Sequence, residues 1–115
     1  MQRDRVLLAE MIEAAEGAIP LVGEQTILQL GQDETRRDAV LWNFTVLSEA
    51  AAQVSEEIRL RHPGVAWQNP IRLRNRIVHG YWSIDLEILY TTATELLPDF
   101  VASLPSVVAS EFPDA

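Results

Sequence analysis

Apolar residues recur every three or four positions along most of the chain, which is the spacing of amphipathic helices. This spacing predicts long helices over residues 3–18, 33–62, 69–80 and 84–104, with a short helical turn within residues 23–31. The sequence shows neither strand-like alternation nor an internal repeat. We therefore expect an all-α bundle of four to five helices joined by short connections.

Capping and helix-breaking residues support these boundaries. Suitable N-caps are Asp33 for the second long helix, Asn69 before Pro70 for the third, and Ser83 or Asp85 for the fourth. Helix breakers at the ends are Pro20, Gly23, Pro63, Gly64 and Gly80. Pro98 should kink or divide the fourth helix, and Pro105 and Pro113 predict an irregular tail over residues 105–115.

Length and composition predict one folded domain over residues 1–115, since 48% of the residues are hydrophobic. The absence of cysteine excludes a disulfide framework and a thiolate metal site. No apolar run approaches the roughly 18 residues of a membrane span, and the first residues lack the hydrophobic core of a signal peptide. We therefore expect a cytoplasmic protein with no membrane partner.

The positive charge of the chain is gathered in one segment. The net charge is −8, yet residues 58–84 contain five of the nine basic residues, all arginine, and no carboxylate. A net negative charge usually disfavours nucleic acid, because the phosphate backbone repels it. A local cluster of arginines can still bind phosphate, so the charge distribution leaves this class of partner open.

The centre of this segment reads as a helix with two unlike faces. At about 100° per residue, one polar stripe is formed by Arg72, Asn75, Arg76 and His79. Arg74 falls instead in the middle of the apolar half, where a guanidinium is costly unless it is paired or faces a polar cavity. Either Arg74 has an acidic partner, for which Glu49 is a candidate, or this face borders an interface that contains a site.

Arg74 and His79 are about 140° apart on an ideal helix, so one straight helix cannot direct both side chains at one atom. They converge only if the helix loosens near Gly80 or if they come from different copies of the chain. A two-fold dimer would bring two arginines and two histidines to one cleft. With two histidines on separate segments, a histidine metal site is not expected.

Histidine and arginine together suit the transesterification of RNA, in which the 2′-OH attacks the adjacent phosphate. Histidine transfers protons near neutral pH, and arginine stabilises charge on a pentacoordinate phosphorus. This route requires neither a metal nor a protein nucleophile. The plainer interpretations are a histidine at a helix C-terminus, a structural ion pair for Arg74, and packing roles for Trp67, Tyr81 and Trp82.

The segment Arg74-Asn75-Arg76-Ile77-Val78-His79-Gly80-Tyr81 resembles the R-N-x-x-x-H-x-Y motif of the HepT-like family within the HEPN superfamily. The resemblance covers nearly the whole chain and includes Asp4-Arg5, residues 37–51 and residues 84–87. It implies a helical bundle that forms a two-fold homodimer. It also implies a metal-independent endoribonuclease site of Arg74 and His79 without a cofactor, supported by Asn75.

The same resemblance implies a toxin of a toxin–antitoxin pair, neutralised by a minimal nucleotidyltransferase antitoxin that transfers AMP to Tyr81. Arg72 and Arg76 are additional to the motif and would contact RNA phosphates, or bind a partner instead. An alternative is a catalytically silent helical module that pairs with a nucleotidyltransferase or binds nucleotide. In a third interpretation, the arginines serve only dimer pairing, with Arg74 bridged to an acid such as Glu49.

Overall fold

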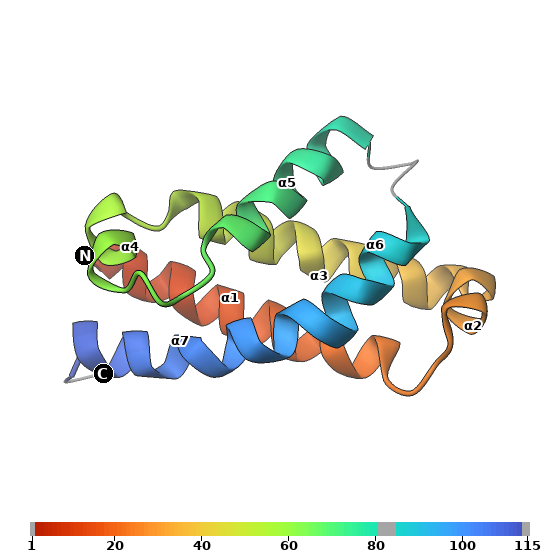
Figure 1. The fold of residues 1–115 in the computed structure, drawn as a ribbon, viewed down its shortest axis with the longest axis horizontal. Helices are drawn as coiled ribbons and strands as arrows, with labels where there is room; N and C mark the ends of the chain where they lie inside the picture. The colour runs from red at the N-terminus through yellow and green to blue at the C-terminus, as the bar shows by residue number, and fades with distance from the viewer. Residues whose placement is uncertain (1, 81–84, 114–115) are drawn as a thin grey trace.

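The computed structural model describes the backbone of residues 2–80 and 85–113, and the side chains of residues 3–77 and 85–113. The elements of this part are α1 (Gln2–Val22), α2 (Ile27–Gln32), α3 (Glu34–Gln53), α4 (Glu56–Arg61), α5 (Gln68–Gly80), α6 (Leu86–Thr91), the π-helical η2 (Thr92–Leu96) and α7 (Leu97–Glu111) (Figure 1). All are helical, so the all-α fold is confirmed. No helix in the described ranges is long and apolar enough to span a membrane.

The core lies between α1 and α3, which pack along most of their length. Their fully buried side chains include Leu8, Met11, Phe44 and Leu47. A Cβ atom at Gly17 would lie only 3.0 Å from Oδ1 of Asn43, so the two helices approach closely at this point. On the other side of α1, α7 runs alongside and buries Leu104 and Val107 (Figure 1).

Helix α5 crosses over α3 and extends away from the bundle toward its C-terminal end (Figure 1). Pro70, Leu73 and Ile77 are buried, and their spacing of three and four places them on one edge of the helix. Trp67 anchors the start of α5 because its ring packs edge-on against Phe100 with a centroid distance of 6.3 Å. The packing role expected for Trp67 is therefore confirmed.

The predicted helix 33–62 is wrong in its continuity, because α3 ends at Gln53 and α4 begins at Glu56. Ser55 is the N-cap of α4, and its hydroxyl accepts a hydrogen bond from the amide of Ile58. The amide of Ser55 donates to Oδ1 of the buried Asp4 at 2.8 Å. These side-chain acceptors stabilise the break in the helix.

Two further helix ends differ from the prediction, because each helix continues through a proline. Helix α1 continues through Pro20 and ends at the buried Val22, and Gly23 follows with a φ of 52°, a conformation that glycine adopts more readily than residues with a side chain. Helix α7 continues through Pro105 to Glu111, so the predicted irregular tail 105–115 is wrong for this part. In both cases burial of apolar residues beyond the proline outweighs the lost backbone hydrogen bond.

The predicted caps Asp33 and Asp85 are confirmed, because each carboxylate accepts an amide hydrogen bond in the first turn of the following helix. The short helical turn is α2, closed by a capping box of Thr26 and Gln29. Pro98 lies in the first turn of α7, directly after the π-helical segment, so the fourth helix changes its winding where the proline occurs.

A charged cluster joins α4 to the end of α7. The carboxylate of Glu111 accepts from Nη2 of Arg61 at 2.6 Å and lies 2.8 Å from Nε2 of His62. The hydrogen bond from Arg61, followed by that from His62, lowers the pKa of Glu111 to about 2, and the bond to Glu111 raises the pKa of Arg61. The cluster therefore depends on an ionised Glu111.

We predict that Asp4→Ala destabilises the protein by about 1–3 kcal/mol, because the amide of Ser55 loses the buried carboxylate that accepts its hydrogen bond. Urea unfolding followed by circular dichroism measures this change. Asp38→Ala is the matched control, since Asp38 is exposed on α3 and should change the free energy of unfolding by less than about 0.5 kcal/mol. Equal effects of the two changes would contradict the role of Asp4.

We also predict that Glu111 makes stability depend on pH between its ordinary pKa of 4.5 and its lowered pKa of about 2. In this window the unfolded chain binds the proton more readily, so the free energy of unfolding decreases as the pH falls. The contribution is complete above pH 4.5. The difference in stability between the parent and Glu111→Gln should shrink as the pH falls from 4.5 toward 2. A difference that grows on acidification would contradict the prediction.

Candidate active site

The sequence-predicted site residues lie on α5, whose buried edge determines which way the others face. Leu73 and Ile77 are 5% and 4% exposed and hold this edge against the bundle. Arg72, Asn75 and Arg76 are exposed. Arg74 is half-buried and lies toward α3, as its contact with that helix shows. The structure thus separates Arg74 from Arg72 and Arg76, which line a groove against α6.

Glu49 of α3 is the acidic partner of Arg74, as expected from the placement of Arg74 on the helix. Nε of Arg74 donates to Oε1 of Glu49 at 3.0 Å. The two side chains are 39% and 42% exposed, so the pair lies at the surface edge of the α3–α5 contact. The hydrogen bond uses Nε, and the terminal guanidinium nitrogens are the atoms suited to a further anionic group.

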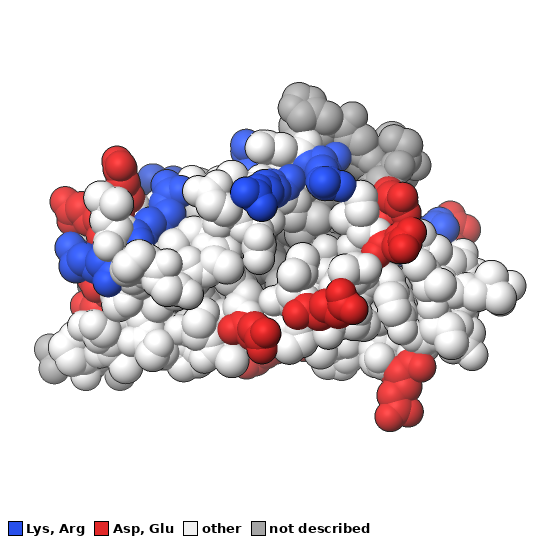
Figure 2. Space-filling model, in the orientation of Figure 1, with Lys and Arg blue, Asp and Glu red and all other residues white. Residues whose placement is uncertain are grey.

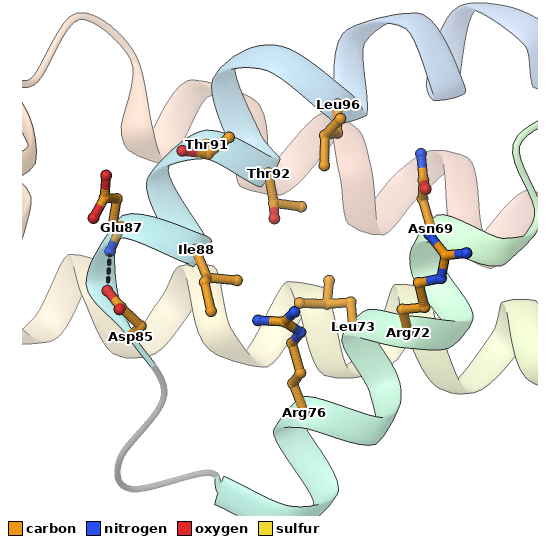
Figure 3. Close-up of a pocket in the computed structure, with 10 residues that line it drawn as sticks. All are labelled: Asn69, Arg72, Leu73, Arg76, Asp85, Glu87, Ile88, Thr91, Thr92 and Leu96. Carbon is orange, nitrogen blue, oxygen red and sulfur yellow. Dashed lines mark hydrogen bonds between the residues drawn. The ribbon is translucent and has the colours of Figure 1, made fainter.

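On the other side of α5, a groove of about 340 Å³ separates this helix from α6 and η2 (Figure 3). Its lining residues on α5 are Asn69, Arg72, Leu73 and Arg76, and those from the following segment are Asp85, Glu87, Ile88, Thr91, Thr92 and Leu96. The side chain of Arg76 reaches from α5 toward Ile88 (Figure 3). The groove therefore has a cationic wall, an apolar floor and an acidic wall.

Positive and negative side chains lie on opposite sides of the groove at the surface of the molecule. Figure 2 shows arginines over α5 and carboxylates along the side formed by α6, η2 and α7. An anionic ligand is thus attracted to the α5 side of the groove and repelled from the opposite side. Sequence reasoning identified Arg72 and Arg76 but missed the acidic wall. Asp85 was expected to be an N-cap and belongs to the segment 84–87 of the family resemblance, and nothing in the sequence pairs it with α5.

His79 lies in the last turn of α5, its side chain is outside the described residues, and Tyr81 lies outside them altogether. The backbone of α5 remains α-helical through Gly80. The five-residue separation of Arg74 and His79 therefore keeps its angle of about 140° in the backbone. Among the described residues, no three histidine or carboxylate groups gather in a way that could hold a metal.

Comparison of the chain with known protein families identifies the class of enzyme to which it belongs. The family model described as Ribonuclease HepT-like matches residues 10–107, a range that includes the whole of α5. The chain belongs to the HepT-like ribonuclease family.

The individual relatives have low sequence identity to this chain, but two of the three described below align with most of its length. "Putative RNase MJ0127" of Methanocaldococcus jannaschii is 23% identical over 90% of this chain and 86% of its own length. "Probable ribonuclease HepT" of Thermococcus cleftensis is 26% identical over 57% of this chain and 60% of its own. "Putative RNase TTE0752" of Caldanaerobacter subterraneus subsp. tengcongensis is 20% identical over 96% of this chain and 99% of its own. No solved structure matches.

We predict that Arg74→Ala leaves the fold intact and changes the free energy of unfolding by less than about 1 kcal/mol, because its ion pair with Glu49 is partly exposed. Leu73→Ala on the same turn should cost about 2–5 kcal/mol, because Leu73 is buried. Thermal and urea unfolding compare the two variants. Loss of the fold or of the assembly in Arg74→Ala would favour a purely structural role for this arginine.

Proposed function

We propose that the protein is a cytoplasmic, metal-independent endoribonuclease that acts as the toxin of a toxin–antitoxin pair. Arg74 and His79 carry the chemistry, Asn75 supports them, and Arg72 and Arg76 contact phosphates of the RNA. The active form is a two-fold homodimer in which the two copies of α5 meet at one cleft. No metal or other cofactor takes part in the reaction.

The proposed reaction is an attack of the ribose 2′-OH on the adjacent phosphorus. His79 accepts the proton of the 2′-OH as the P–O bond forms, and Arg74 stabilises the extra negative charge on the phosphorane oxygens. The bond from phosphorus to the 5′ oxygen then breaks, and the partner's His79 protonates the leaving oxygen. The products are a 2′,3′-cyclic phosphate and a 5′-OH end, so no water is consumed in this step.

The position of Arg74 carries this proposal. This chain belongs to the HepT-like ribonuclease family. Its motif arginine, Arg74, is 39% exposed and is oriented by Glu49 rather than buried in the core. An arginine in this position can contact a polymer at the surface. The continuous α-helix through Gly80 supports the two-copy alternative, since the helix does not loosen before that residue.

The proposed antitoxin is a minimal nucleotidyltransferase that modifies Tyr81. The oxygen of the tyrosine attacks the α-phosphorus of ATP, loses its proton and displaces pyrophosphate, which leaves AMP on the side chain. Tyr81 lies two residues after His79 in the sequence. An attached AMP would add negative charge beside the arginines and occupy the space needed by RNA.

His79→Ala should abolish RNA cleavage, because the variant lacks the group that transfers the proton. The measurement is cleavage of RNA in EDTA by the parent and by His79→Ala, each expressed without a nucleotidyltransferase, with analysis of the product ends. The parent should leave 2′,3′-cyclic phosphate ends. Equal cleavage by the two proteins would refute the assignment of His79.

Intact mass is the control for this experiment, since an AMP-modified parent would be inactive for another reason. Tyr81→Phe cannot accept AMP and should retain cleavage after co-expression with the nucleotidyltransferase. If an unmodified, dimeric parent does not cleave RNA, the alternative applies: a silent helical module that pairs with a nucleotidyltransferase or binds nucleotide.

A further inference from the structure

The groove between α5 and α6 has opposite charges on its two walls. Arg72 and Arg76 are exposed and line the α5 wall, whereas Asp85 and Glu87 line the α6 wall. Between them lie apolar side chains, including Leu73, Ile88 and Leu96 (Figure 3). A ligand that matches this arrangement has an anionic group, a flat apolar middle and hydrogen-bond donors at its other end.

We propose that the groove binds one unpaired nucleotide of the RNA substrate, with its phosphate at Arg72 and Arg76 and its base over the apolar floor. The base N–H groups then lie toward the α6 wall, where the carboxylates of Asp85 and Glu87 are hydrogen-bond acceptors. This subsite rests on the proposed ribonuclease function and determines which RNA the enzyme selects. It is separate from the Arg74–Glu49 side of α5.

The size of the groove favours a single nucleotide over a duplex. Its volume of about 340 Å³ lies at the lower end of the range for small-molecule sites. A base must leave its stack to enter such a groove, and this costs least in loops and single strands. The groove therefore selects RNA that is unpaired at this position.

The direction of the groove connects it to the motif. Asn69, Arg72 and Arg76 follow one another by three and four residues on the same side of α5. The next position in this series is His79, so the stripe leads along the helix to the turn that carries the proposed proton acceptor. An RNA strand that follows α5 would place a flanking nucleotide in the groove.

Binding of RNA methylated on every 2′ oxygen tests this proposal, since such RNA cannot be cleaved by 2′-OH attack. Arg72→Gln/Arg76→Gln should weaken binding of the single strand by at least about tenfold. The slope of log affinity against log salt should become shallower by about 0.7, because the contact with one phosphate is lost. Leu96→Ser should weaken binding without changing the slope, because it alters the apolar floor at a residue that is 43% exposed.

Arg5→Gln/Arg37→Gln is the matched control, since it removes the same charge from α1 and α3, outside the groove. It should weaken binding less than threefold. Equal losses in the two double variants would overturn the proposal in favour of general attraction. Equal affinity of the parent for the single strand and for its duplex would also overturn it, as would dissociation of the dimer in Arg72→Gln/Arg76→Gln.

Cleavage measured in parallel separates this proposal from the ribonuclease function. If the parent cleaves RNA in EDTA and the groove variants bind and cleave as it does, the subsite is wrong and the ribonuclease function stands. If an unmodified, dimeric parent binds the single strand through Arg72 and Arg76 but cleaves no RNA, the groove stands as a nucleotide site and the ribonuclease function is wrong.

Discussion

Burial of one edge of α5 against α3 is the constraint on which the candidate site depends. Leu73 and Ile77 are almost fully buried, and each contributes roughly 1.5–3 kcal/mol by leaving water. The partly exposed pair of Arg74 and Glu49 contributes at most about 1 kcal/mol. The apolar contacts therefore set the rotation of the helix. The arginines take the directions that remain: Arg74 lies toward α3, Arg76 reaches toward α6 (Figure 3), and Arg72 lines the same groove as Arg76.

This rotation gives the two arginine faces different environments on one short helix. The Arg74 face has a fixed carboxylate that orients the guanidinium and offsets part of its charge. The face with Arg72 and Arg76 opens on a groove whose carboxylates lie on the opposite wall. A polymer with a regular series of phosphates can contact both faces at once, whereas a compact anion can contact only one. The geometry therefore suits an extended strand.

Local signals in the sequence predicted much of the fold because helices are specified by nearby residues. Asp33 and Asp85 were identified as N-caps from their own helices, and the pairing of Arg74 with Glu49 followed from the cost of an arginine on an apolar face. The break before α4 was missed because Val54 and Ile58 on its two sides are both buried, so the apolar spacing continues across it. Its acceptor, Asp4, is distant in the sequence.

Only the part of the candidate site that lies on α5 was predictable from the sequence. The residues of α5 are contiguous, so their spacing showed which of them share a stripe. The opposite wall of the groove is formed by α6 and η2, and only the packing of these elements brings Asp85 and Glu87 to the same groove as Arg76. Residue types alone contain no signal for that approach. Long-range features of this kind were also responsible for the error at Pro105, where burial of Val107 overrides a helix breaker.

The π-helical segment between α6 and α7 absorbs an extra residue in the last third of the fold. Its i to i−5 hydrogen bond, from the amide of Leu97 to the oxygen of Thr92, accommodates one residue more than an α-helix would. The deletion of one residue here would restore α-helical winding and leave α7 close to its present rotation relative to α6, because four α-helical residues turn through nearly the same angle as the five residues of the π-helical turn. Leu89 and Phe100, on its two sides, would then stay in the core. In regular α-helix the same deletion would rotate all that follows by about 100°, so the chain can lose a residue here with less disturbance than elsewhere in the helix.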